Sequence, residues 1–169
     1  MFQVFTKNLL FSTILFISYS LISEEYKAGE HYQILPQTIA TRDAKKIEII
    51  EFFWFGCGHC YSLENQLKSW EEKLPSDIDF WRSPITWNEM AKTHAKLFFA
   101  AEFFEKPEII SNTFVSIHAN RRMMTSDQEL QPFFASFGIT EDQYLSLFNS
   151  FAMQNKIRRA DTFGLKYQI

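Results

Sequence analysis

Two cysteines, Cys57 and Cys60, lie two residues apart in the segment Cys-Gly-His-Cys, and the 169-residue chain contains no others. A thiolate can attack a disulfide and pass through a mixed-disulfide intermediate, so such a pair can exchange a disulfide with a substrate. A bond that closes so short a loop restricts the unfolded chain very little. We therefore expect the pair to carry redox chemistry, although an inert structural bond is an alternative.

Two ionisable residues accompany the cysteines. His59 lies between them, and its imidazolium would stabilise a Cys57 thiolate and make the disulfide more oxidising. The alternative is that His59 is an exposed spacer. Glu51 lies six residues before Cys57 in an apolar run, where a carboxylate needs a partner or a raised pKa. It could relay a proton to Cys60, or it could face solvent at a sheet edge. These four residues are the candidate catalytic residues.

The neighbouring elements place this motif between a strand and a helix. Residues 47–55 are a near-continuous run of β-branched and aromatic residues, which predicts a strand buried on both faces. Apolar residues at helical spacing predict a helix that begins at about Cys57 and stops at Pro75. Free amides and the helix dipole at its N-terminus would lower the pKa of Cys57. Cys60 lies one helical turn further along and should be more buried than Cys57.

Further strands and helices follow from the same patterns. Residues 78–83 predict a second strand, so strand, helix and strand form a parallel βαβ unit, and residues 32–35 are a shorter strand candidate.

Only helices are expected from Asn88 onward. Capping boxes are expected over 126–129 and 140–143, and a last helix over 151–163. Pro132 should kink its helix or delay the start of that helix.

Bulk composition narrows the class of protein. Apolar residues make up 46% of the chain, which suits one domain with a real core. The net charge is -3 and no basic stripe is present, so we expect no nucleic-acid partner. A structural zinc site needs four ligands, and none of the four histidines has suitable spacing from the cysteines. We expect neither a metal nor a cofactor.

The first 23 residues differ from the rest. Lys7 is the only charge among them, and the apolar run 9–22 is 14 residues long, whereas a membrane-spanning helix needs about 20. The pattern predicts a secretory signal peptide over residues 1–23, with an uncleaved membrane anchor as the alternative. Export would bring the two cysteines into an oxidising compartment.

These features resemble the DsbA family of periplasmic thiol oxidases. The resemblance covers the chain from about residue 25 to its end, and it is carried by Glu51-Phe52-Phe53, Cys57-x-His59-Cys60-Tyr61, Tyr32, Leu35, Leu74-Pro75, Asn149-Ser150-Phe151, Ile157, Ala160 and Tyr167. It implies an α/β, thioredoxin-like fold with an inserted all-helical domain. Residues 24–85 would form the N-terminal half of the thioredoxin-like domain, 86–157 the insertion, and 158–169 the start of the return.

The resemblance also implies roles and partners. Cys57 would be the nucleophile, Cys60 the resolving thiol, His59 the stabilising group and Glu51 the buried acid. The family introduces disulfide bonds into exported proteins with free thiols. A quinone-linked membrane partner similar to DsbB reoxidises it in the periplasm.

Two departures from the family pattern keep alternatives open. Gly58 stands where the family more often has proline. The dipeptide Gly58-His59 instead resembles that of protein disulfide isomerase, so an isomerase or reductase of the same fold is an alternative.

The second departure is at the C-terminus. The family pattern continues beyond Ile169 with a Gly-Val-Pro segment, two strands and a helix. We expect these C-terminal elements to be missing, which would leave an unpaired edge on the strand 47–55 and a poorly stable, weakly active chain. A truncated, inactive peptide-binding module is therefore the other alternative.

Overall fold

The computed structural model describes residues 25–169. The predicted signal peptide, residues 1–23, lies outside this range. Within the described range, no helix combines the length and the apolar character that crossing a membrane requires. The chain divides after Pro36 into two units.

The first unit, over its described residues 25–36, is built around a local turn. Gly29 adopts a φ of 83°, and its N–H donates a hydrogen bond to the carbonyl of Tyr32 at 2.7 Å. A single isolated bridge joins Ala28 and Tyr32. The predicted strand over 32–35 is therefore wrong, because this backbone bonds to its own turn rather than to a neighbouring strand.

The second unit, Gln37–Ile169, contains the predicted parallel strand pair. β1 (Ile47–Phe53) and β2 (Ile78–Pro84) run in a register that pairs Glu51 with Arg82. The expectation that β1 is buried on both faces is wrong: Phe53 is its only fully buried residue. The physical reason is that the sheet has only two strands in the described part of the chain, so most of β1 is half-covered.

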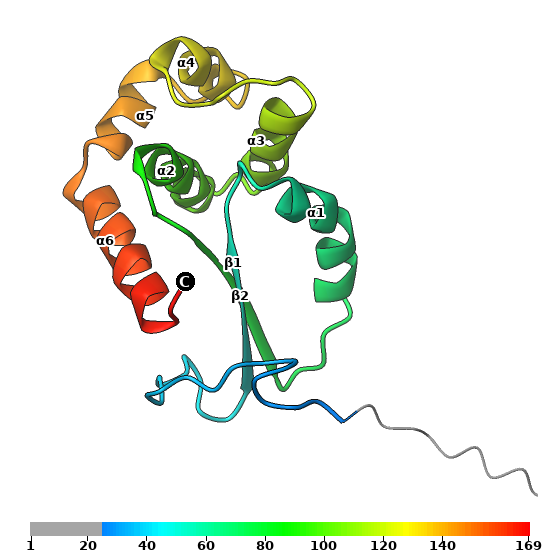
Figure 1. Ribbon diagram of the computed structural model, residues 1–169. Helices are drawn as coiled ribbons and strands as arrows, with labels where there is room; N and C mark the ends of the chain where they lie inside the picture. The colour runs from blue at the N-terminus through cyan, green and yellow to red at the C-terminus, as the bar shows by residue number, and fades with distance from the viewer. Residues whose placement is uncertain (1–24) are drawn as a thin grey trace, which may run out of the picture. The chain divides into compact units, whose positions relative to one another are not determined.

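Helices cover the two faces of this pair. α1 (Gly58–Glu71) begins where the sequence predicts, and α1 and α6 (Phe151–Lys166) lie on opposite sides of the strands (Figure 1). Phe52 and Trp81 pack against Phe163 of α6, with ring centroids 5.6 and 5.0 Å from it. Glu51, one residue before Phe52, and Arg82, one residue after Trp81, point to the opposite face, because side chains alternate along a strand.

The remaining helices follow in sequence, as predicted from Asn88 onward. They are α2 (Glu89–Phe103), α3 (Glu108–His118), α4 (Asp127–Ala135), α5 (Glu141–Phe148) and α6.

Two capping predictions have opposite outcomes. The capping box of Thr140 and Gln143 is complete at the start of α5. The one predicted at Ser126 and Glu129 is wrong, because the Ser126 side chain makes no cap bond. The Glu129 carboxylate instead accepts hydrogen bonds from the backbone N–H groups of Met123 and Thr125, which lie before the helix.

Pro132 lies inside α4 and does not delay its start at Asp127. It is the sixth residue of α4 and lies past the first turn, so its missing N–H removes the hydrogen bond that an N–H at this position would donate to the carbonyl of Gln128.

The main core surrounds the carboxyl end of β1. Phe53 and Phe55 are each 1% exposed, and Phe55 packs edge-on against Phe114 of α3 with ring centroids 4.8 Å apart. Phe98 of α2 packs on Phe53 at 5.3 Å. The chain segment that leads to Cys57 is therefore embedded in the helical part of the molecule.

Candidate active site

Cys57 is the N-cap residue of α1. Its backbone is extended, with φ -84° and ψ 116°, and its N–H donates to the carbonyl of Trp54 at 2.9 Å. Its Sγ accepts a hydrogen bond from the backbone N–H of Cys60 at 3.4 Å. Both cysteines are free thiols and half-buried. The helix start thus turns its unpaired amides toward the Cys57 sulfur.

The pKa of the Cys57 thiol is lowered. Desolvation acts to raise this pKa, but hydrogen bonds to the sulfur from the Cys60 thiol and from the amides of Cys60 and His59 outweigh it. These donors are worth more to a thiolate than to a thiol, since charge-assisted hydrogen bonds are the stronger kind. The shift has the direction that the sequence predicts.

Cys60 has the opposite character. It packs against the hydrophobic core beside Tyr61. Burial raises the pKa of its thiol to about 11, and its hydrogen bond to Cys57 adds to the rise. When the reduced pair loses one proton, the negative charge therefore lies on Cys57, while Cys60 holds its proton.

His59 lies on the exposed side of the first turn of α1. Its backbone amide is one of the groups that stabilise the Cys57 sulfur. Its imidazole forms no hydrogen bond with any residue of the range 25–169.

Glu51 faces α1 and is paired. Its side chain is 13% exposed, and its Oε2 lies 2.5 Å from Nε of Arg82. Burial raises the pKa of Glu51, and the Arg82 guanidinium partly opposes this rise. The alternative that Glu51 faces solvent is wrong. Its charge also contributes to the raised pKa of Cys60, so the two groups interact electrostatically.

Sequence reasoning missed Arg82 and Glu64, which complete this charged cluster. The Arg82 guanidinium forms two parallel hydrogen bonds to the Glu64 carboxylate of α1, at 3.1 and 2.9 Å, in addition to its bond to Glu51. A usable signal was present, because Arg82 is the only cation in the second predicted strand and Glu51 stands at the matching position of the first.

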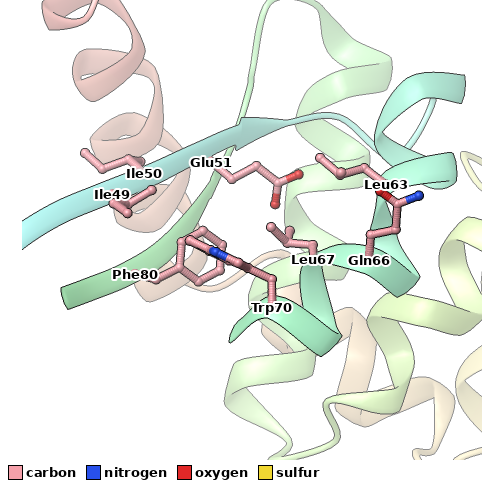
Figure 2. Close-up of a pocket in the computed structure, with 8 residues that line it drawn as sticks. All are labelled: Ile49, Ile50, Glu51, Leu63, Gln66, Leu67, Trp70 and Phe80. Carbon is pink, nitrogen blue, oxygen red and sulfur yellow. The ribbon is translucent and has the colours of Figure 1, made fainter. Parts of the chain in front are cut away.

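A cavity of about 460 Å³ opens beside Glu51 on the α1 face. Figure 2 shows the Glu51 carboxylate directed toward α1, between the strands and the side chains of Leu63 and Leu67. The lining is mainly apolar, and its residues are Ile49, Ile50, Glu51, Leu63, Gln66, Leu67, Trp70 and Phe80. These walls account for the desolvation that raises the pKa of Glu51.

The other histidines do not join the cysteines. Trp54 donates a hydrogen bond to His94, and His118 stacks on Tyr61 with ring centroids 4.8 Å apart. Among residues 25–169, no three histidine, cysteine or acidic side chains are grouped so that they could hold a metal ion.

The chain is similar to curated proteins named thiol:disulfide interchange protein DsbA. It is 31% identical over 148 residues to the protein of Pseudomonas aeruginosa, a match that covers 87% of this chain and 70% of that one. It is 32% identical over 151 residues to the protein of Azotobacter vinelandii, covering 89% and 71%. A comparison with protein-family models found no match.

Solved structures agree with these relatives. The crystal structure of Pseudomonas aeruginosa DsbA matches with a TM-score of 0.79 at 30% identity, over 87% of this chain and 77% of that chain. DsbA from Xylella fastidiosa, at 24% identity and a TM-score of 0.68, has the same fold. The fold is therefore thioredoxin-like α/β with a helical insertion, and the chain belongs to the DsbA family of thiol:disulfide oxidoreductases.

Proposed function

We propose that Cys57 and Cys60 form the redox pair through which this chain introduces disulfide bonds into exported proteins that carry free thiols. The observation that carries this proposal is the separation of the two thiol pKa values, lowered at Cys57 and raised to about 11 at Cys60. The Cys57 sulfur is therefore the better nucleophile and the better leaving group, and the Cys60 sulfur stays protonated.

The reaction begins with the Cys57–Cys60 disulfide. A substrate thiolate attacks Sγ of Cys57, the bond between the two cysteines breaks, and Cys60 leaves and takes up a proton. A second substrate thiolate then attacks the substrate sulfur of the mixed disulfide, and Cys57 leaves as a thiolate. The substrate loses two electrons to form its disulfide, and the cysteine pair gains them. A leaving thiol of low pKa leaves faster, which favours this direction.

Glu51 and His59 take supporting roles in this proposal. The charge of Glu51 acts on the Cys60 thiol, and the pKa of Glu51 is raised. Glu51 can therefore supply the proton that Cys60 takes up and accept it again on reoxidation. His59, when protonated, stabilises the Cys57 thiolate from the solvent side. Arg82 is a positioning residue that holds Glu51 on the α1 face.

The proposal extends to the cellular setting and the domains. Residues 1–23 direct export to the periplasm, as a signal peptide or a membrane anchor, and a quinone-linked membrane protein similar to DsbB reoxidises the pair. Residues 24–85 and 158–169 belong to the thioredoxin-like domain, and residues 86–157 form the helical insertion. The family membership supports each of these assignments.

A stoichiometric oxidation assay tests the function. The oxidised chain is mixed with a peptide that contains two thiols, and formation of the peptide disulfide is followed by mass spectrometry. The wild type should oxidise about one peptide per chain, and Cys57→Ser none. Cys60→Ser, first loaded at Cys57 as a mixed disulfide with glutathione, should pass that disulfide to the peptide.

Two outcomes would count against the proposal. A wild-type chain that binds the peptide without oxidising it would favour a peptide-binding module. A redox equilibrium with glutathione that lies far toward the Cys57–Cys60 disulfide would favour a reductase.

A further inference from the structure

Two histidines of the helical region, which comprises α2 to α6, contact the segment that immediately precedes Cys57. His94 of α2 is 2% exposed, and its Nδ1 lies 2.9 Å from Nε1 of Trp54. Its Nε2 lies 2.9 Å from the carbonyl oxygen of Met123, in the loop before α4. His94 therefore bridges the end of the strand region to a loop of the helical region.

The partners of His94 fix its protonation. A carbonyl oxygen can only accept, so Nε2 carries the proton and donates to Met123. An indole N–H can only donate, so Nδ1 is unprotonated and accepts from Trp54. The lowered pKa of His94, caused chiefly by burial, agrees with a neutral ring at neutral pH.

His118 of α3 makes the second contact, one residue further along. Its Nε2–H donates to the backbone carbonyl of Phe55 at 2.8 Å. The flat face of the same ring stacks on Tyr61, which follows Cys60, with an interplanar angle of 8°. One imidazole thus contacts both the segment before Cys57 and the first turn of α1.

The contacted segment controls the geometry of Cys57. The Trp54 carbonyl accepts the hydrogen bond of the Cys57 N–H at 2.9 Å. Gly56 lies directly against the indole of Trp54, and a Cβ added there would meet that ring at 2.4 Å. A shift of Trp54 or Phe55 would therefore move the Cys57 sulfur relative to the amides of His59 and Cys60.

We propose that His94 and His118 are positioning residues of the redox centre, which hold Trp54 and Phe55 so that the Cys57 sulfur stays over the amides at the start of α1. This inference rests on the proposed function. It assigns to the helical region a part in setting the acidity of Cys57, in addition to packing.

The test compares isosteric variants of the full chain. His94→Phe and His118→Phe each remove the hydrogen bonds and keep a ring. Trp54→Phe removes the indole donor and leaves His94 in place. His94→Gln keeps an acceptor and a donor on one side chain and is the rescue variant. Thr113→Val is the control, because Thr113 is buried in α3 and bonds only the carbonyl of Ile109.

The readout is the pH profile of Cys57 alkylation in the reduced protein, with folding checked by circular dichroism. His94→Phe, His118→Phe and Trp54→Phe should each raise the alkylation pKa by about half a unit, which is a roughly threefold loss of thiolate below that pKa. His94→Gln and Thr113→Val should keep the wild-type profile. The double variant His94→Phe/Trp54→Phe should shift no further than either single variant.

Folded variants with the wild-type profile would overturn the inference. If His94→Phe does not fold, Trp54→Phe decides for the His94 contact. A wild-type Cys57 that titrates like free cysteine would instead overturn the proposed function, so the two failures are distinguishable.

Discussion

Glu51 of β1 and Arg82 of β2 occupy directly paired positions of the parallel sheet and form an ion pair on the face toward α1. Arg82 also bonds Glu64, and its guanidinium lies 4.3 Å from the centre of the Phe53 ring. One cation thus serves two carboxylates. The charge of Glu51 contributes to the raised pKa of the Cys60 thiol.

Removal of the shared cation should destabilise the fold. Arg82→Met leaves two largely buried carboxylates without a partner, and breaking a buried pair typically costs about 3 kcal/mol. We expect a loss of this size in the free energy of unfolding, measured by urea denaturation at pH 7. The control Glu64→Gln keeps the pair of Arg82 with Glu51 and should cost less. An Arg82→Met protein as stable as the wild type would show that the ion pairs do not support the fold.

The raised pKa of Glu51 predicts a pH dependence. Because this pKa is higher in the folded than in the unfolded chain, the folded state binds the proton first as the pH falls. The contribution of Glu51 to the free energy of unfolding should therefore become more favourable from neutral pH down to about 4.5, the ordinary value. Unfolding of wild type and Glu51→Gln at several pH values measures this, and a difference independent of pH would contradict it.

The sequence predicts the local order of elements around Cys57 and Cys60 better than it predicts how those elements are buried and paired. The order strand, Cys-x-x-Cys, helix, strand follows from local patterns, since β-branched runs and helical spacing depend on near neighbours. The N-cap position of Cys57 follows from the same local order.

Burial and partners depend on residues distant in sequence, which local patterns do not contain. The incomplete cover of β1 is a property of the sheet and not of the run 47–53. In the sequence, His94 and His118 are not distinguished from other residues of predicted helices. Only the packing of α2 and α3 brings them to Trp54 and Phe55. Opposite charges at matching positions of two parallel strands were the one readable long-range signal.

Alkylation should discriminate strongly between the two thiols. At pH 7 the reduced chain should react with iodoacetamide at Cys57 and hardly at Cys60, whose pKa of about 11 leaves very little thiolate. Peptide mapping by mass spectrometry after brief exposure measures the ratio. Cys57→Ser is the control: Cys60 should remain slow there, because burial is the main cause of its raised pKa and survives the substitution. Equal labelling of both thiols in the wild type would contradict the assignment.

Two glycines flank Cys57 and should respond differently to alanine. A Cβ at Gly56 would lie 2.4 Å from the Trp54 ring, which cannot swing away without losing its bond to His94. Gly56→Ala should therefore cost about 1–3 kcal/mol. Gly58 has open space around it and begins α1, so Gly58→Ala should be neutral or stabilising by up to about 1 kcal/mol. Urea unfolding of both variants checks this pair, and equal effects would contradict the steric explanation.

Protonation of His94 should weaken the fold in mild acid. Its pKa is lowered by burial, so below about pH 6.5 the unfolded chain binds a proton there that the folded chain does not. The free energy of unfolding should then fall with pH, by at most about 1.4 kcal/mol per unit from this group, until His94 is protonated in the folded state. The Glu129 carboxylate limits the effect, because its charge favours the protonated ring. His94→Gln has no such group, so between pH 7 and pH 5 its stability should fall less than that of the wild type. Parallel pH profiles for the two proteins would mean that His94 has the same pKa in the folded and the unfolded chain, which would contradict this prediction.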